Sequence, residues 1–264
     1  MSVRVARPSA HTAEVILDRP EALNAISTEF AQQILQACDE LLIDDQLSVV
    51  LITSSGSKAF CVGADLKERA GFSDHDLRKQ RPVIQDSFGS VRNLPVPTLA
   101  VVEGYALGGG CELALSCDLI IASETAIFGL PEVGLGLIPG GGGTQLLPRR
   151  IGWNRAADLI FTGRQLTAVE AYRLGIADRL VAAGTARSEA LQLAGEITAN
   201  SPVSLRAAKL ALRQGFDVDL ASGLLIEHES WEQVAYSADR QEGIAAFIAR
   251  RKPRWPGRHG GDYG

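Results

Sequence analysis

The chain has 264 residues, of which 46% are hydrophobic, so it can form one large domain, or a domain with a smaller appendage, around a sizeable core. Its formal net charge of −5 argues against nucleic acid or a membrane surface as the main partner. No signal-peptide core opens the sequence, and no apolar run reaches the roughly 18 residues of a membrane-spanning helix. We therefore expect a cytoplasmic protein with no membrane or nucleic-acid partner.

The first half of the chain alternates strand-like and helix-like segments. Four runs rich in β-branched and other apolar residues are predicted as strands: residues 13–18, 47–54, 97–104 and 119–130. Residues 27–45 carry apolar side chains at helical spacing, with Ser27 as the expected N-cap. This alternation indicates an α/β fold with helices covering the sheet.

After about residue 150 the strand signals thin and helical signals dominate. Five helices are expected there, at residues 153–163, 167–175, 184–200, 201–215 and 217–237. Ser201 and Pro202 open the fourth of them as N-cap and first helical residue. The pattern alone does not distinguish such a helical block from an oligomerisation module.

Several nucleotide, hydrolase and metal motifs are missing or weak. The chain has no GxxxxGK[ST] phosphate loop and no GxSxG elbow, and the run GGGGTQ at 140–145 lacks the GxGxxG spacing of a dinucleotide loop. Asp74, His75 and Asp76 are adjacent, but a capped helix start explains them better than a metal site. The four cysteines form no CxxC pair, so we expect reduced, buried thiols and no bound metal.

Two glycine-containing turns follow predicted strands and enter helix-like segments. One passes through Gly63, Ala64 and Asp65, and the other is the triplet 108–110 in "GYALGGGCELALSCDLI". Small residues let backbone N–H groups face a ligand, and two such groups converging on one oxygen would form an oxyanion hole. Close packing of helix against sheet is the simpler interpretation of either turn taken alone.

Two glutamates lie in comparably unusual surroundings. Glu112 comes two positions after the triplet, in the first turn of the expected helix. Glu132 lies in the apolar, glycine-rich stretch "GLPEVGLGLIPGGGG", and is either a solvated loop residue or a carboxyl with a raised pKa that suits a proton donor. If the two carboxyls meet at one oxyanion hole, they could add water to a double bond.

The segments "FCVGADLKERA", "NLPVPTLAVVEGYALGGGCELALSCDL", "GLPEVGLGLIPGGGGTQLLPRRIG" and "EGIAAFIARRKPRW" together resemble the crotonase superfamily, specifically an enoyl-CoA hydratase. The branch they resemble is that of the 3-methylglutaconyl-CoA, or AU-binding, hydratases. The resemblance implies a spiral of ββα units over residues 1–198 and a helical trimerisation domain over 199–264. It also implies a homotrimer or a homohexamer built as a dimer of trimers.

Carried over by position, the resemblance places the oxyanion hole at the N–H groups of Ala64 and Gly109, and the catalytic acids at Glu112 and Glu132. It implies no cofactor, because coenzyme A enters as part of the acyl-CoA substrate. The expected CoA contacts are Ala22, Leu23, Val62, Ala64, Asp65 and Leu66.

The chain departs from the family pattern at Glu21, where many relatives have lysine. A carboxylate there would not attract the CoA phosphates, so the ionic contacts are expected from Lys67, Arg251 or Lys252.

Three functions compete at this point. The first is hydration of a 2-enoyl-CoA in fatty-acid or branched-chain amino-acid breakdown, the second is double-bond isomerisation through the same enolate, and the third is RNA binding. Two glutamates favour hydration, since isomerases of the superfamily often keep only the acid at the Glu132 position. RNA binding is disfavoured because the early helix has no basic residue and four acids within residues 31–45.

The sequence leaves the acyl group open. Arg69 or Arg81 could bind a free carboxylate on the substrate, although a solvated surface arginine is the simpler interpretation of each.

Overall fold

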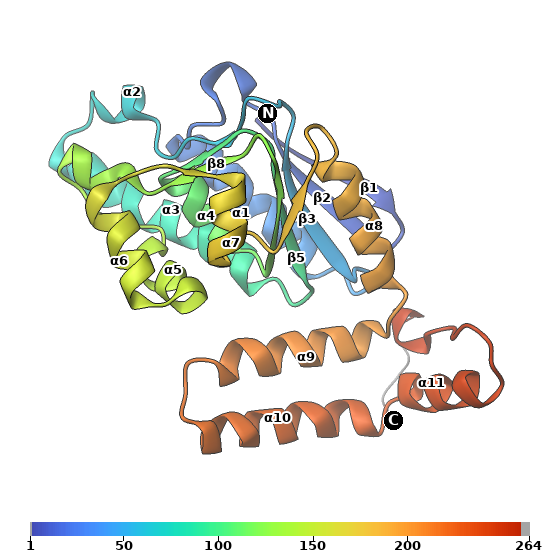
Figure 1. Cartoon of the computed structure of the whole chain (residues 1–264). Coiled ribbons are helices and arrows are strands. Elements are labelled where there is room, and N and C mark those ends of the chain that lie inside the picture. The colour runs from blue at the N-terminus through green and yellow to red at the C-terminus, as the bar shows by residue number, and fades with distance from the viewer. Residues whose placement is uncertain (1, 260–264) are drawn as a thin grey trace.

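The computed structural model describes residues 2–259, and its largest element is a six-stranded sheet (Figure 1). The strands lie in the order β1 (Val3–Ser9), β2 (Thr12–Leu17), β3 (Val49–Ser54), β5 (Thr98–Val102), β7 (Leu119–Ser123) and β10 (Arg179–Val181). The β1–β2 pair is antiparallel and the other neighbours are parallel. The four runs predicted as strands all contribute to this sheet, and the α/β expectation is confirmed.

A second, smaller sheet is formed by short strands that come directly after strands of the first. Its order is β4 (Ala59–Cys61), β6 (Tyr105–Leu107), β8 (Ile127–Gly129) and β9 (Leu166–Thr167). Thus β3 leads to β4, β5 to β6 and β7 to β8, and each pair is followed by at least one helix. This repetition is the expected spiral of ββα units.

The helices cover both faces of the large sheet. They are α1 (Thr28–Leu42), α2 (Leu66–Arg69), α3 (Asp74–Asn93), α4 (Gly109–Leu115), α5 (Gly143–Ile151), α6 (Trp153–Thr162), α7 (Ala168–Leu174), α8 (Ala186–Thr198), α9 (Pro202–Gly215), α10 (Leu220–Ala235) and α11 (Ala238–Ile248). Residues Val50 and Ile52 of β3 pack into the core that α1 shares, whereas Val49 and Leu51 pack against α8. Since successive side chains of a strand point to opposite faces, a strand covered on both sides is apolar throughout.

The expected helix caps are present. Ser27 accepts a hydrogen bond from the Phe30 N–H at the start of α1. Ser201 accepts one from the Ser204 N–H at the start of α9, where Pro202 is the first helical residue. Ser73 and Asp76 form a reciprocal capping box on α3, so the Asp74–Asp76 segment is a helix start.

The structure differs from the sequence-based expectation in several places, and the helix α5 and the short strands β9 and β10 are among the elements that were not predicted. The run 119–130 forms two strands in different sheets, because a turn closed by the bond from the Ala126 N–H to the Ser123 carbonyl interrupts it. The edge strand β1 was not predicted, because most of its residues are exposed and some are charged, which hides the strand pattern. Helix α11 was also not predicted as a helix.

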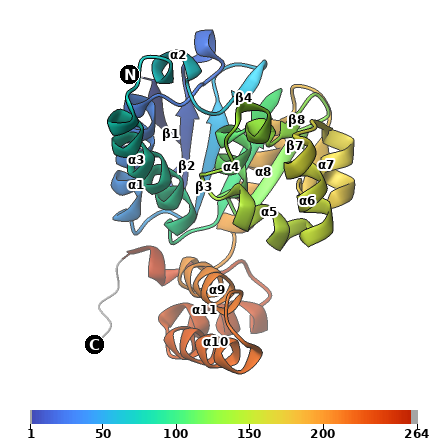
Figure 2. The same ribbon diagram turned by 90° about the vertical axis from the view of Figure 1, so that its left-hand side faces the viewer.

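The last three helices form a layer of their own. Figures 1 and 2 show α9, α10 and α11 beneath the two sheets, with α9 and α10 side by side. All five helices expected after residue 150 are present. The expected domain 199–264 includes residues 260–264, which lie outside the described residues. Within residues 2–259, no helix has both the length and the apolar character required to cross a lipid bilayer.

Candidate active site

In the glycine triplet at 108–110, two of the glycines lie so close to other groups that a side chain would not fit or would be crowded. A Cβ on Gly110 would collide with the Cys61 carbonyl, so this glycine permits close packing of α4 on β4. Gly108 has φ +53°, and a Cβ there would lie 3.2 Å from Oε1 of Glu132. One glycine of the triplet therefore permits close packing, and another lies beside a candidate catalytic acid.

The second glycine turn lies directly against the first. A Cβ on Gly63, whose φ is +87°, would lie 2.9 Å from the Gly109 nitrogen. The bridge to Ile26 uses the Gly63 carbonyl and the Asp65 N–H, at 2.7 and 3.0 Å, and leaves the Ala64 N–H out. Gly109 is the first residue of α4, so its N–H has no acceptor within the helix. The two N–H groups expected to form an oxyanion hole thus belong to adjoining turns.

Glu112 is fixed by a four-glycine loop. The carboxyl belongs to a residue only 3% exposed, and its Oε1 accepts hydrogen bonds from the N–H groups of Gly141 at 2.7 Å and Gly143 at 2.8 Å. Burial raises the pKa of Glu112, and these two N–H groups together with the charge of Arg81 offset part of that rise. The loop holds the carboxylate in one orientation.

The contact between this loop and Glu112 was not predicted from the sequence. Residues 140–143 entered the prediction only as a weak dinucleotide motif and as part of a segment that resembles the family. A signal was nevertheless present: the run precedes a helix whose N-cap, Gly142, has no side chain to bond the first N–H groups. Such N–H groups are available to a carboxylate from elsewhere in the chain.

Glu132 has a different environment from Glu112. It lies in the short 3-10 helix Pro131–Leu135, and within the described chain its buried Oε2 has no hydrogen-bond partner. Burial raises the pKa of Glu132 to about 7, and the negative charge of Glu112 adds to the rise. The two carboxyls are close enough to influence each other, and Glu132 is poised to hold a proton near neutral pH.

The residues expected to contact CoA form two groups. Those of the first group, in the Ala22–Leu23 loop and the Val62–Lys67 segment, lie close together in the fold. Ala22 ends the 3-10 helix Pro20–Ala22, and Leu23 follows with φ 52°. This loop is tied to the Val62–Lys67 segment by the ion pair between Arg19 and Asp65, at 2.8 Å. Leu66 is 53% exposed and Lys67 is exposed on α2, so both can be reached from solvent.

The second group, Arg251 and Lys252, lies elsewhere. Arg251 follows α11 and pairs with Glu242, with Nη1 2.6 Å from the carboxylate. Figures 1 and 2 both place α11 at the opposite end of the molecule from α2. One chain therefore does not bring these two cations to the loop around Glu21, whose own side chain is 74% exposed. If they contact the same CoA, they must come from another copy.

The two arginines considered for a substrate carboxylate lie near the glutamate site. The guanidinium of Arg81 packs directly on Gly140, next to the loop that holds Glu112. Arg69 donates from Nε to Gln80 at 2.9 Å, and burial lowers the pKa of Arg69. In the part of the chain that the structure describes, no group of three or more His, Cys, Asp or Glu side chains could hold a metal ion.

Comparison with known proteins agrees with this geometry. The family model described as enoyl-CoA hydratase/isomerase matches residues 8–258. Enoyl-CoA hydratase domain-containing protein 2, mitochondrial, of Mus musculus is 42% identical over 255 residues, covering 95% of this chain and 86% of that protein. The mitochondrial methylglutaconyl-CoA hydratase of Homo sapiens is 42% identical over 249 residues, covering 91% of this chain and 72% of that protein.

A solved structure gives the same result for the fold. The enoyl-CoA hydratase of Bacillus anthracis superposes with a TM-score of 0.96 at 39% identity, covering 97% of this chain and 100% of that one. Family match, relatives and fold thus agree over nearly the whole chain, which belongs to the enoyl-CoA hydratase/isomerase family within the crotonase superfamily.

Proposed function

We propose that the protein hydrates 2-enoyl-CoA thioesters, adding water syn across the double bond. The observation that supports this proposal best is that two carboxyl groups with different hydrogen-bond environments lie beside the same glycine turn. Glu112 is held by two backbone N–H groups, whereas Glu132 has an unpartnered oxygen and a pKa of about 7. Two acids whose environments differ in this way suit a base and an acid in one reaction.

In the proposed reaction, the Glu112 carboxylate removes a proton from water while the water oxygen bonds to C3 of the enoyl group. The electron pair of the double bond moves to the thioester oxygen, and the N–H groups of Ala64 and Gly109 hold the enolate. Glu132 then gives its proton to C2, and the thioester carbonyl re-forms. Proton exchange with solvent returns both carboxyls to their starting states, and no resident cofactor takes part.

Isomerisation of the double bond is the alternative reaction. It moves a proton from one carbon to another and needs no activated water, so a single acid at the Glu132 position suffices. Glu112 is buried and accepts two hydrogen bonds, so a second oriented carboxyl is present, which supports hydration over isomerisation.

The acyl group and pathway belong to the same proposal. Breakdown of fatty acids or branched-chain amino acids would supply such thioesters, and one relative is named a methylglutaconyl-CoA hydratase. A substrate with a free carboxylate is the narrower possibility, and the position of Arg81 beside Gly140 supports it.

A homotrimer or homohexamer with acyl-CoA as its small-molecule partner is also proposed. The helical layer supports it, since Leu220 is 79% and Phe247 is 86% exposed in a single chain. The four cysteines are free and buried, which supports a reducing compartment such as the cytoplasm. Specific RNA binding is not expected, because α1 carries acids and no basic residue.

The test is a panel of acyl-CoA thioesters, assayed for loss of the enoyl absorbance and for the 3-hydroxyacyl product. The panel includes straight-chain, branched and carboxylate-bearing 2-enoyl groups, and 3-enoyl isomers. We expect the highest kcat/KM with a 2-enoyl group. Conversion of 3-enoyl substrates without hydration of any 2-enoyl thioester would contradict the proposal in favour of the isomerase.

A further inference from the structure

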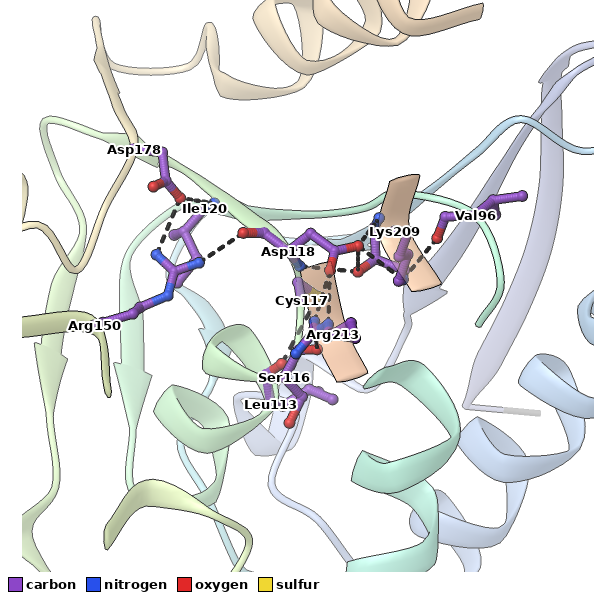
Figure 3. A network of polar contacts seen from close by, with 11 residues as sticks. Val96, Leu113, Ser116, Cys117, Asp118, Ile120, Arg150, Asp178, Lys209 and Arg213 are labelled. Atoms are coloured by element: carbon purple, nitrogen blue, oxygen red, sulfur yellow. Dashed lines mark hydrogen bonds and ion pairs between the residues drawn. The ribbon is translucent and has the colours of Figure 1, made fainter. Parts of the chain in front are cut away.

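A partly buried ion network joins the helical layer to the segment that follows α4 (Figure 3). The carboxylate of Asp118 accepts from Lys209 Nζ at 2.8 Å, and from Arg213 at 2.7 Å through Nη2 and 3.1 Å through Nε. Lys209 is 8% exposed and also donates to the Val96 carbonyl at 2.7 Å. Burial alone would raise the pKa of Asp118, but the charge of Lys209 and its hydrogen bond hold that pKa below its usual range. Asp118 is therefore an anion at neutral pH.

The same network reaches the backbone of Glu112. Arg213 Nη2 lies 3.4 Å from the Ser116 carbonyl, which is the C-cap residue of α4. Ser116 in turn donates to the Glu112 carbonyl from its N–H at 3.0 Å and its hydroxyl at 2.9 Å. Arg213 is thus two contacts away from the main chain of a proposed catalytic residue.

Helix α4 is followed by a segment that contacts cations of two other helices, because Arg150 of α5 donates to the Asp118 carbonyl at 2.8 Å in addition to the contacts of Lys209 and Arg213 from α9. The residues of α4 from Gly110 to Leu115 are all buried, and its last carbonyls need hydrogen-bond donors. Cations at the C-terminal end of a helix also interact favourably with its dipole. The N–H groups of Ser116 and Cys117 bond the last carbonyls of α4. Lys209 and Arg213 bring the cations, and Arg213 also donates to the carbonyl of the C-cap residue Ser116, from a helix 90 or more residues further along the chain.

Docking of α9 does not depend on this network alone. Arg206, on the same helix, donates to the carbonyls of Asp44 and Leu47 at 3.1 and 3.0 Å, in the loop after α1. Arg149 and Asp217 form another link, an exposed pair at 2.8 Å. A buried ionic group contributes little net stability in comparison with apolar residues of the same size. The position of the network at the end of α4 therefore calls for a reason beyond attaching the helix.

We propose that Arg213, with Lys209, positions the active site: by fixing Asp118 and Ser116 it sets α4, whose first turn carries Gly109 and Glu112. The helical layer and the catalytic helix then move as one unit. Arg213 is a positioning residue, since it acts through Ser116 and Asp118 and touches no reacting atom.

The experiment compares Arg213→Met with Arg206→Met. Both arginines are half-buried on α9 and bond to the sheet-containing part of the chain, but only Arg213 reaches α4. For Arg213→Met we expect kcat about tenfold lower with KM changed less than about twofold, because a small misplacement of a catalytic group lowers the chemical rate strongly. Arg206→Met keeps the kcat of the unmodified enzyme.

A second readout does not depend on the proposed reaction. Amide hydrogen exchange over residues 109–115 should rise in Arg213→Met and stay unchanged in Arg206→Met. The kinetic part rests on the proposed hydratase function, whereas this part does not. An enzyme inactive on every thioester therefore refutes the function alone.

If Arg213→Met does not fold, the same measurements are made on Arg213→Lys. One ammonium group keeps the charge but replaces the planar fork that bonds Asp118 twice, so a kcat loss of about two- to threefold with raised exchange in α4 is expected. Equal effects of the Arg213 and Arg206 changes, or an Arg213→Lys enzyme with unchanged kcat and unchanged exchange in α4, would overturn the proposal.

Discussion

At the level of single residues, the two glutamates have different chemistry because their hydrogen-bond environments differ. Glu112 gains two N–H donors, while Glu132 keeps a buried oxygen without a partner among the described residues. Desolvation acts on both, but donors compensate for it mainly at Glu112. The pKa of about 7 at Glu132 has consequences for both rate and stability.

The first prediction concerns kinetics. Glu132→Gln and Glu112→Gln should each lower kcat by roughly 10²–10⁴-fold, with much smaller changes in KM, because each removes an acid–base group. Because the two carboxyls act in closely coupled steps, the double variant should lose less than the product of the single losses. Steady-state kinetics of the four proteins test this, and fully multiplicative losses would mean that the carboxyls serve separate events.

The second prediction is the pH dependence of hydration. Glu132 must start protonated to donate its proton, so kcat/KM should fall as pH rises through about 7. Glu112 must start ionised, which gives a fall on the acid side. In Glu132→Gln the alkaline fall should disappear from the residual activity. A pH–rate profile of that variant with the same alkaline fall would assign it to another group.

The third prediction is a gain in stability. Because the folded pKa of Glu132 is above the ordinary value of 4.5, its stabilising contribution is fully present below 4.5 and is lost as pH rises through about 7. Glu132→Gln should therefore raise the free energy of unfolding at pH 8 by about 1–2 kcal/mol. This is less than the full shift implies, because the carboxyl is partly solvated. Denaturant unfolding at pH 8 and pH 4 measures the gain, which should be near zero at pH 4, below both pKa values.

At the level of structural elements, the loop of residues 140–143 shows how a turn can fix the side chain of a proposed catalytic residue, Glu112. A Cβ on Gly143 would lie 3.0 Å from Oε1 of Glu112 and 2.9 Å from the Pro139 side chain. Gly134, in the neighbouring 3-10 helix, has nothing within 4 Å of the corresponding position. Two glycines of nearby segments thus differ in whether they can accept a methyl group.

The fourth prediction uses this pair. Gly143→Ala should displace the Glu112 carboxyl and lower kcat by about tenfold or more, because orientation of the base is lost. Gly134→Ala should keep kcat within about twofold. Both are measured with the best substrate of the panel, and a crystal structure of Gly143→Ala should show Oε1 moved away from the Gly141 N–H. Equal kcat values for the two variants would contradict the role of the loop.

At the level of the whole molecule, the helical layer leaves large apolar side chains in water. Leu220 and Phe247 are 79% and 86% exposed, whereas a stable single chain covers most such groups. The separation of Arg251 from α2 leads to the same idea, since only another copy could bring that cation to a CoA bound at Ala22 and Leu66.

The fifth prediction is therefore an assembly built on trimers. Sedimentation at micromolar concentration should give a trimer or hexamer, and Leu220→Glu with Phe247→Glu should reduce it to smaller species. Ile43→Glu, at an equally exposed apolar residue (84%) outside the helical layer, is the matched control. A monomer in the unmodified protein, or dissociation caused only by Ile43→Glu, would contradict this assignment.

Features that depend on local chemistry could be predicted from the amino-acid sequence. Ser27, Ser73 and Ser201 cap helices through bonds to N–H groups three residues away, and the glycine triplet places Glu112 in the first turn of α4. These interactions span only a few residues, so the pattern of the chain is enough to predict them. The edge strand β1 was not predicted, because charged and exposed residues interrupt its apolar pattern.

The properties of the candidate site come from contacts between distant segments, which form only in the folded chain. The charge of Glu112 acts on Glu132, the N–H groups of Gly141 and Gly143 bond Glu112, and Arg213 bonds Asp118; these pairs lie 20 to 95 positions apart in the sequence. It also placed Arg251 far from the loop that it was expected to serve. Desolvation and long-range hydrogen bonds depend on which segments pack together, and packing is a property of the whole fold rather than of any short stretch of sequence.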